Sequence, residues 1–316
     1  MANLLAAPRT SRETPSSPII PFANLSRLLL STLLFAIIHG AISDQQVISS
    51  PRDSCITQDA PNQHSQQYPD LATGILNGTT LIVPISLQTA RQIIPAEYGI
   101  IEDAYRALLP SFPDGMYPMM AQIVHDHDIK LASMNASLPD FSRASLEFPF
   151  IDVLGDGVTS FRWANTFMMS ASNPLAIQGA EGYGISVYPS TFHPSCNAYE
   201  ASSLLDGATF AHSQSTNSTM DTFMTIETSP SRDMVPYPLD FIANVTNQPV
   251  FGNPSQCDYY MRLFNSTMAS GAVPVVGKVR TNLEPLIQPQ IWDGVFGWQV
   301  ATPFLEPTAP EPCRAT

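Results

Sequence analysis

Prolines and glycines interrupt this chain at short intervals, and this pattern constrains the fold more than any other sequence feature. The 316 residues include 29 prolines and 16 glycines, so most uninterrupted segments are short. Many of these segments are rich in β-branched and aromatic residues, as in Thr79 to Leu87. We therefore predict an α+β fold in which a mainly antiparallel β-barrel or sheet dominates and a few helices flank it.

The extended segments can be located one by one. They are predicted at residues 79–87, 116–129, 144–153, 158–169, 185–188, 223–228, 273–280 and 295–300. Leu87 to Ile94 has helical spacing and is followed by Pro95, which ends a helix. The turn Gly155-Asp156-Gly157 predicts a hairpin between two extended segments.

The charge balance excludes some partners. The formal net charge is −13, and Lys130 and Lys278 are the only lysines in the sequence. No basic stripe is present, so we expect no binding to nucleic acid and no electrostatic docking on anionic lipid.

The N-terminus has the pattern of a secretory signal segment. Three arginines precede an apolar run at residues 28–38, and Ala41-Ile42-Ser43 fits a cleavage site before Asp44. The apolar run is too short to cross a bilayer comfortably, so we expect no stable membrane span after cleavage. An uncleaved anchor and a buried helix of a cytosolic protein are the alternatives. We predict a secreted protein or one that resides in the secretory-pathway lumen.

Sequons and cysteines agree with that compartment. Five sequons follow the apolar run, and their predicted glycosylation sites are Asn77, Asn135, Asn217, Asn244 and Asn265. Four cysteines also follow it, and an even number in an oxidising compartment favours two disulfides. Of the three pairings, we favour Cys55 with Cys313 and Cys196 with Cys257; four free thiols are the alternative. The cysteine spacing is too wide for a metal knuckle.

These features divide the chain into four parts. Residues 1–43 form the signal segment, and residues 44–74 form a polar lead-in. A β-barrel domain is predicted over residues 75–305, and residues 306–316 form a proline-rich tail.

Four segments, taken in order, resemble the acetoacetate decarboxylase family. They are residues 77–95 (NGTTLIVPISLQTARQIIP), 120–129 (MAQIVHDHDI), 146–163 (LEFPFIDVLGDGVTSFRW) and 173–189 (NPLAIQGAEGYGISVYP). The order and spacing of these segments carry the resemblance, which spans roughly residues 75–300. It implies a closed, cone-shaped antiparallel barrel with flanking helices and an active site inside the barrel.

The family's reactive lysine has no counterpart here. In the family that lysine forms an imine with a β-keto acid. An apolar pocket or a neighbouring cation activates such a lysine by lowering its pKa. The matching position falls on Val187 in one alignment and on Ser190 in another. The arginine of the family's opening strand is also missing from residues 75–86, whereas Glu147 and Glu181 match the family's carboxylates.

The resemblance and the residue chemistry together nominate a set of site residues. Glu147 and Glu181 are the predicted acid–base groups, and Arg162 is predicted to hold a carboxylate or enolate. The alternative for Glu147 and Arg162 is a structural ion pair. The predicted substrate-binding residues are Trp163, Tyr183 and His125.

The HDHD cluster offers one competing possibility. His125 and His127 project to the same side of a strand and could share a metal ion, with a carboxylate or His193 completing the site. The competing interpretation is a pair of hydrogen-bonded histidines, and we predict no metal and no cofactor.

The function that the resemblance implies is a lyase or isomerase. We expect it to act on a small keto acid or polyketide-type metabolite of secondary metabolism through carboxylate acid–base chemistry. The alternative is a non-catalytic barrel glycoprotein that binds a small molecule. Carboxylates lining an open cavity would favour the enzyme, and a purely apolar cavity would favour the binding protein. A homo-oligomer is compatible with either function.

Overall fold

The computed structural model describes residues 61–203, 206–265 and 271–315. The predicted signal segment, the first part of the lead-in and Cys55 lie outside these ranges. Among the helices in the described ranges, none has the length and apolar character needed to cross a membrane.

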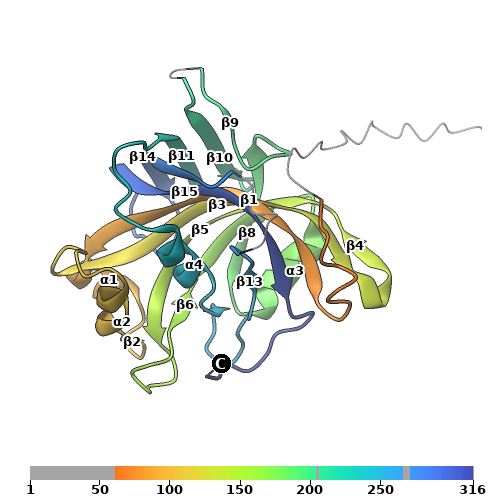
Figure 1. The fold of residues 1–316 in the computed structure, drawn as a ribbon, viewed down its shortest axis with the longest axis horizontal. Coiled ribbons are helices and arrows are strands. Elements are labelled where there is room, and N and C mark those ends of the chain that lie inside the picture. The colour runs from red at the N-terminus through yellow and green to blue at the C-terminus, as the bar shows by residue number, and fades with distance from the viewer. Residues whose placement is uncertain (1–60, 204–205, 266–270, 316) are drawn as a thin grey trace, which may run out of the picture. The chain divides into compact units, whose positions relative to one another are not determined.

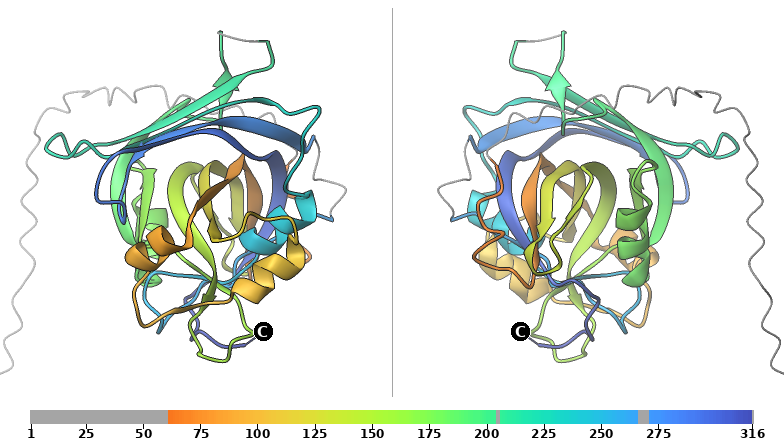
Figure 2. Two further views of the ribbon diagram at one scale, coloured as in Figure 1. Left: turned by 90° about the vertical axis from the view of Figure 1, so that its left-hand side faces the viewer. Right: turned by 90° about the vertical axis from the view of Figure 1, so that its right-hand side faces the viewer.

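Nine strands close into a ring (Figures 1 and 2). They are β1 (Ala72–Ser86), β3 (Met116–Leu131), β5 (Phe141–Asp152), β7 (Thr166–Ser170), β8 (Ser186–His193), β10 (Thr209–Ser215), β11 (Phe223–Pro230), β14 (Val273–Asn282) and β15 (Gln290–Glu306). The order around the ring is β5-β7-β8-β10-β11-β14-β15-β1-β3, and the pairing of β3 with β5 closes it. The predicted barrel is therefore confirmed.

Shorter elements decorate the ring. The additional strands are β2 (Gly99–Ile100), β4 (Ala136–Leu138), β6 (Phe161–Trp163), β9 (Glu200–Ala201), β12 (Val250–Phe251) and β13 (Met261–Arg262). The helices are α1 (Leu87–Ile93), α2 (Glu102–Leu108), α3 (Pro174–Gly182) and α4 (Leu239–Thr246), with one 3-10 turn, η1 (Ala132–Met134).

Most predicted segments match observed strands, and two differences are informative. The predicted strand at 158–169 is two strands, β6 and β7, which join different neighbours. The sheet is mixed because β7 and β8 run parallel, with α3 as their crossover. The hairpin predicted at Gly155-Asp156-Gly157 is confirmed as the antiparallel β5–β6 pair.

The inner face of the ring can be identified from strands that have one exposed side. In β10, β11 and β14, buried residues alternate with more accessible ones, and Ala211, Ile226 and Val279 share one buried row in register. The Nε2 of Gln299 on β15 reaches Thr209 of β10 at 2.6 Å across the same interior. Residues that are paired in register on adjacent strands lie on the same face of the sheet. The inward side of each ring strand can therefore be assigned from these pairs.

Among the described residues, no acidic or amine side chain of the nine ring strands points into the ring. Its buried inward positions carry apolar, hydroxyl, amide and imidazole groups, such as Met119, Leu146, Met224 and His125. Glu147, which the resemblance places in an active site inside the barrel, therefore does not point into the ring. The carboxylates of β3 and β5 lie at alternate positions and point outward.

The outward faces of β1, β3 and β5 are also buried. Nearly all residues of these three strands are buried, whereas in β10 buried and more accessible residues alternate. Two smaller apolar clusters lie on this outer side, one containing Ala176 and Ala180 of α3 and the other containing Phe304 and Tyr260. The molecule therefore has a second buried layer outside the ring.

One predicted glycosylation site conflicts with this packing. The side chain of Asn77 is buried on β1, where it points into the ring, so a glycan there is incompatible with the folded chain. Asn135, Asn217, Asn244 and Asn265 are exposed.

Candidate active site

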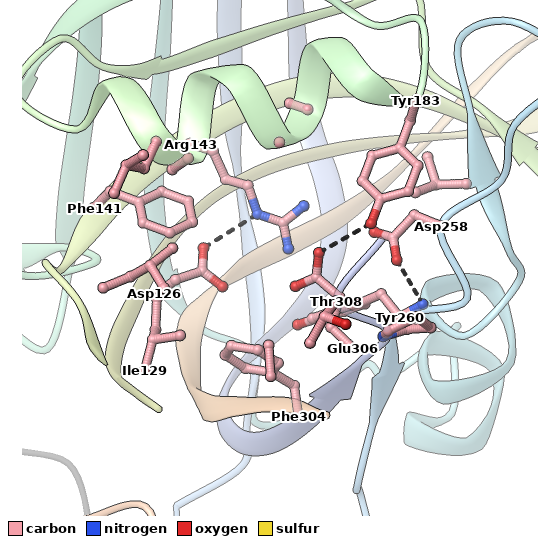
Figure 3. A pocket seen from close by; sticks show the side chains of 18 of the residues that line it. Asp126, Ile129, Phe141, Arg143, Tyr183, Asp258, Tyr260, Phe304, Glu306 and Thr308 are labelled. Atoms are coloured by element: carbon pink, nitrogen blue, oxygen red, sulfur yellow. Dashed lines mark hydrogen bonds and ion pairs between the residues drawn. The ribbon is translucent and has the colours of Figure 1, made fainter. Parts of the chain in front are cut away.

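A cavity of about 250 Å³ lies in the outer buried layer (Figure 3). It is bounded by α3, by the ends of β3, β5, β7 and β15, and by the chain that follows β15. Its wall is largely apolar, with contributions from Ile129, Phe141, Phe167, Met169, Ala176, Ala180, Ile185 and Phe304. Seven polar residues also line it, and they are Asp126, Arg143, Tyr183, Asp258, Tyr260, Glu306 and Thr308.

Helix α3 forms one wall because local sequence positions it there. Asn173 caps its N-terminus by accepting a hydrogen bond from the Ala176 amide at 3.1 Å, and Pro174 follows as the first helical residue. Ala176 and Ala180 face the sheet. The helix ends before Gly184, whose φ of +76° turns the chain toward β8 and leaves Tyr183 beside the cavity.

Arg143 and Asp126 form a buried ion pair. They lie on adjacent strands, and the Nε of Arg143 donates to Oδ2 of Asp126 at 3.2 Å. The guanidinium also lies over the rings of Tyr260 at 5.4 Å and Phe167 at 5.8 Å. Burial raises the pKa of Asp126, although the Arg143 charge acts in the opposite direction. The ion pair therefore fixes the orientation of the Arg143 guanidinium.

Asp258 and Glu306 form the acidic side of the cavity. Burial raises the pKa of Asp258 to about 7. Burial and the nearby Asp258 raise the pKa of Glu306 well above its usual range. The hydroxyl of Tyr183 donates to Oε1 of Glu306 at 3.4 Å, and burial raises the pKa of Tyr183 as well. Both carboxyls can consequently hold a proton near neutral pH.

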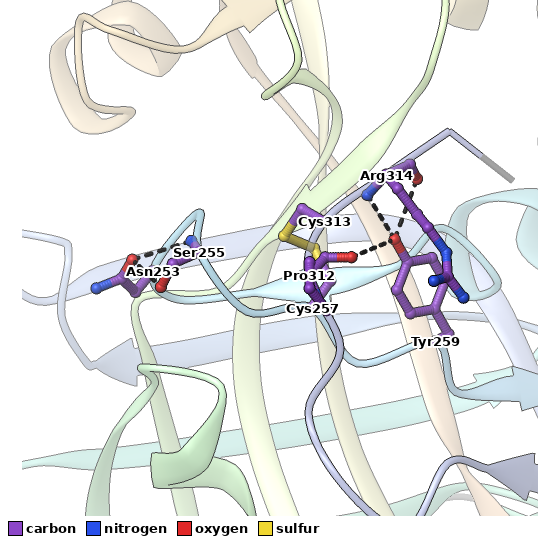
Figure 4. Close-up of a disulfide and its surroundings, with 7 residues drawn as sticks. All are labelled: Asn253, Ser255, Cys257, Tyr259, Pro312, Cys313 and Arg314. Atoms are coloured by element: carbon purple, nitrogen blue, oxygen red, sulfur yellow. Dashed lines mark hydrogen bonds between the residues drawn. A yellow bond between two sulfur atoms is a disulfide. The ribbon is translucent and has the colours of Figure 1, made fainter.

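A disulfide joins the two segments that carry these carboxyls (Figure 4). Cys257 precedes Asp258 in the chain and bonds to Cys313, seven residues after Glu306. The Cys257 amide donates to the carbonyl of Glu311 at 2.7 Å, so the tail pairs with this segment. Residues 307–310 of the tail line the cavity.

The favoured disulfide pairing is therefore wrong. The backbone pairing of Cys257 with Glu311 brings Cys313, rather than Cys196, to Cys257. Cys196 is also disulfide-bonded, and Cys55 lies outside the described residues.

Glu147 and Arg162 lie in the apolar core and do not line the cavity. Oε2 of Glu147 and Nε of Arg162 are 2.6 Å apart, and both side chains are buried. Oε1 of Glu147 accepts hydrogen bonds from Gln122 at 2.5 Å and Ser145 at 2.6 Å. Arg162 donates to the last carbonyls of α4. The structural ion pair that we considered as an alternative is thus present.

The other predicted site residues are dispersed. Glu181 is exposed on α3, and Trp163 packs against Phe148 in the core. Tyr183 lines the cavity. Val187 packs in the apolar cluster beneath α3, and the buried Ser190 donates to the carbonyl of Tyr188.

The histidines of the HDHD segment point into the ring. The rings of His125 and His127 stack with centroids 6.0 Å apart, and Nδ1 of His125 lies 2.9 Å from the Ser142 hydroxyl. Within the described ranges no group of three or more His, Cys, Asp or Glu side chains is arranged to hold a metal ion.

Neither lysine reaches the cavity. Lys130 pairs with Asp128 at 3.1 Å, and Lys278 pairs with Asp293 at 2.9 Å; both side chains are partly exposed. An imine with a lysine is therefore not supported by the geometry of this site.

Sequence reasoning missed most of the polar residues of the cavity. Asp126 belongs to the HDHD segment, where it points to the opposite face of β3 from the two histidines. Arg143, Asp258, Tyr260 and Glu306 carry no motif, and they come from three segments far apart in the chain. Asp258 and Glu306 each lie near a cysteine in the sequence. Without knowledge of the tertiary contacts, that proximity does not predict a shared site.

No protein-family model and no curated protein matches the chain. Solved structures do match. Acetoacetate decarboxylase from Legionella pneumophila has a TM-score of 0.48 and 10% identity, and the match covers 90% of this chain and 99% of that one. The chain is similar in fold to acetoacetate decarboxylase.

Two other solved structures match in the same way. An acetoacetate decarboxylase-like enzyme from Sphingomonas wittichii has a TM-score of 0.44 and 8% identity, covering 78% of this chain and 94% of that one. The enduracididine biosynthesis enzyme MppR, complexed with pyruvate, has a TM-score of 0.43 and 10% identity, covering 84% and 95%. The resemblance expected from the sequence is thus present as a structural match over most of the chain. At these identities it concerns the fold alone.

Proposed function

We propose that this protein is a lyase or isomerase that moves protons on a small keto acid or polyketide-type metabolite. The observation that carries the proposal is the pair of protonatable carboxyls, Asp258 and Glu306, beside Arg143 in a largely apolar cavity. It replaces the predicted acid–base pair Glu147 and Glu181, because the former is held in the core and the latter is exposed.

Arg143 is the group suited to hold the substrate's carboxylate. In the described part of the chain only its Nε makes a hydrogen bond, to Asp126, and Figure 3 shows the rest of the guanidinium directed toward Glu306 and Tyr183. A planar guanidinium binds a carboxylate through two parallel hydrogen bonds. A bound anion would also favour the protonated forms of Asp258 and Glu306.

The proposed chemical step is enolisation. One carboxyl, protonated, gives its proton to the ketone oxygen, and the other, ionised, takes a proton from the adjacent carbon. The electron pair of that C–H bond becomes the carbon–carbon double bond of the enol, so the net charge and electron count are conserved. A carboxyl with a pKa of about 7 is suited to both roles near neutral pH.

The lining of the cavity favours this enzyme over a passive binding barrel. A site that only stored an apolar molecule would gain nothing from burying three carboxyls, because each costs free energy to bring out of water. The carboxylates that line an open cavity are the feature expected to separate the two functions.

Isotope exchange tests the proposal directly. Acetoacetate in D2O should exchange its C2 protons faster with the protein than without it, as measured by NMR. Glu306→Gln combined with Asp258→Asn should reduce the accelerated exchange by about 10²-fold or more. Glu181→Gln, on the exposed face of α3, is the matched control and should leave the rate unchanged. Full exchange activity in the double variant would remove the assignment.

We also propose that the protein is secreted and glycosylated. The support is the N-terminal pattern, the disulfide and the exposure of Asn135, Asn217, Asn244 and Asn265. Glycosidase treatment of protein secreted from eukaryotic cells should lower its mass, and peptide mapping should find no glycan on Asn77.

A further inference from the structure

We propose that the hydroxyl of Tyr260 is a donor reserved for an oxygen atom of the ligand, and that the ligand therefore carries a ketone or enolate oxygen at this point of the cavity. This inference rests on the proposed function and deepens it, because it names a substrate contact that neither the carboxyls nor Arg143 supplies.

The hydroxyl of Tyr260 is buried without a partner. The residue is 5% exposed and lines the cavity, yet its oxygen has no hydrogen-bond partner among the described residues. Other tyrosines nearby differ: the hydroxyl of Tyr183 donates to Glu306, and that of Tyr259 contacts the tail at Pro312. Buried polar groups are nearly always paired, so a solitary one beside a cavity points to a partner that arrives with the ligand.

The position of the ring is fixed by two neighbouring side chains and by its own backbone. Its centroid lies 5.2 Å from that of Phe304, and the guanidinium of Arg143 lies 5.4 Å from it. The Tyr260 amide donates to Oδ1 of Asp258 at 2.9 Å, which holds the backbone (Figure 3). The side chain therefore cannot swing to another acceptor without losing this packing, and the hydroxyl is pre-positioned for a ligand atom.

The surrounding charges select the kind of oxygen. Burial raises the pKa of Tyr260, so its hydroxyl keeps its proton and acts as a donor. The guanidinium of Arg143 adds positive charge beside the same ring. An oxygen that gains negative charge, as a ketone does on enolisation, is stabilised by such a donor and such a charge.

A pair of isosteric acids tests this contact. Acetoacetate and butyrate have the same four-carbon chain and carboxylate, but only acetoacetate has the ketone oxygen. Calorimetric titration should show Tyr260→Phe binding acetoacetate about tenfold more weakly than the wild type. Its affinity for butyrate should be unchanged, because butyrate has nothing to accept the hydrogen bond.

Tyr105→Phe is the matched control. Tyr105 is equally buried, but its hydroxyl donates to the Met116 carbonyl at 3.0 Å, away from the cavity. It should lower the thermal midpoint of the ligand-free protein and leave both affinities unchanged. Tyr260→Phe should keep or raise that midpoint, since its hydroxyl is unpaired before the ligand binds.

The outcomes separate this inference from the proposed function. If the wild type prefers acetoacetate and Tyr260→Phe keeps that preference, the Tyr260 contact is refuted while the enolisation proposal stands. If Tyr260→Phe loses the preference but Glu306→Gln with Asp258→Asn keeps full exchange activity, the contact stands and the acid–base assignment fails. Equal affinity of the wild type for the two acids, or no binding of either, overturns the contact and the keto-acid class together.

Discussion

At the scale of single residues, two buried arginine–carboxylate pairs of this chain differ in their surroundings. Glu147 and Arg162 are enclosed by the core, where Gln122 and Ser145 donate to Glu147 and Arg162 donates to carbonyls at the end of α4. Arg143 is paired through Nε alone and borders a cavity. The first pair is suited to a structural role and the second to binding a ligand, because of these two pairs only the second borders the cavity.

Replacing Glu147 should therefore act on stability. Glu147→Gln leaves the Arg162 charge buried without its counter-ion, and we expect a loss of about 3–5 kcal/mol in the free energy of unfolding, measured by urea denaturation. Glu181→Gln at the exposed position should change it by less than about 0.5 kcal/mol. A stable Glu147→Gln variant would show that the pair is dispensable.

Asp258 and Glu306 should make stability fall as pH rises. The pKa of an unfolded aspartate is about 3.9, whereas that of folded Asp258 is about 7. Between these values the folded chain keeps a proton that the unfolded chain has released, so each rise in pH favours unfolding. Glu306 acts in the same direction. The stabilisation is complete below about pH 4 and is lost as the pH passes through the folded value.

Urea midpoints measured from pH 4 to pH 8 check this sign. Asp258→Asn should flatten the decline, because the amide has no proton to release. A slope that is identical in the wild type and in Asp258→Asn would contradict the role of this carboxyl.

At the scale of elements, the turn after α3 determines where the helix sits over the cavity. Gly184 has a φ of +76°, and a Cβ there would lie 2.4 Å from the Cβ of Asn253. The amides of Gly252 and Asn253 donate to the Tyr183 carbonyl at 3.0 and 3.2 Å. The turn thus binds α3 to the segment before Asp258, and both together shape the site.

Two glycine substitutions should separate this turn from the helix itself. Gly184→Ala should lose about 2 kcal/mol or more, since it combines a left-handed backbone with a backbone clash. Gly179→Ala on α3 meets no atom within 4 Å and should gain up to about 1 kcal/mol from helix propensity. Equal effects in urea denaturation would contradict the tight contact at Gly184.

The disulfide should matter for the cavity as well as for stability. It closes a 56-residue span, so Cys257→Ser with Cys313→Ser should lose about 2–4 kcal/mol. The freed tail no longer walls the cavity, and acetoacetate should bind more weakly by calorimetry. Tyr259→Phe, which removes hydrogen bonds to the tail but keeps the disulfide, should have a smaller effect on both quantities. Unchanged binding in the double serine variant would show that the tail is not needed as a wall.

At the scale of the whole molecule, the ring is a packed support, and the site that we propose lies outside it. Inward residues from opposite strands fill the interior, and the ionisable side chains gather where α3 and the tail cover the outer face.

Borohydride trapping tests the absence of an amine mechanism across the molecule. Reduction in the presence of acetoacetate should add no ligand mass to the folded protein, because Lys130 and Lys278 are surface residues in ion pairs. Peptide mapping by mass spectrometry checks both lysines. A stoichiometric reduced adduct on either would restore an imine mechanism.

The local sequence determined the elements of this protein. Alternation, β-branched residues and turn glycines located strands such as β3 and β5, and Pro95 marked the end of α1, because these signals depend on neighbours within a few residues. Only the tertiary structure decided the site. Asp126, Arg143, Asp258 and Glu306 meet because ring closure and a disulfide bring distant segments together, and the pKa values of the carboxyls depend on burial that no local pattern records.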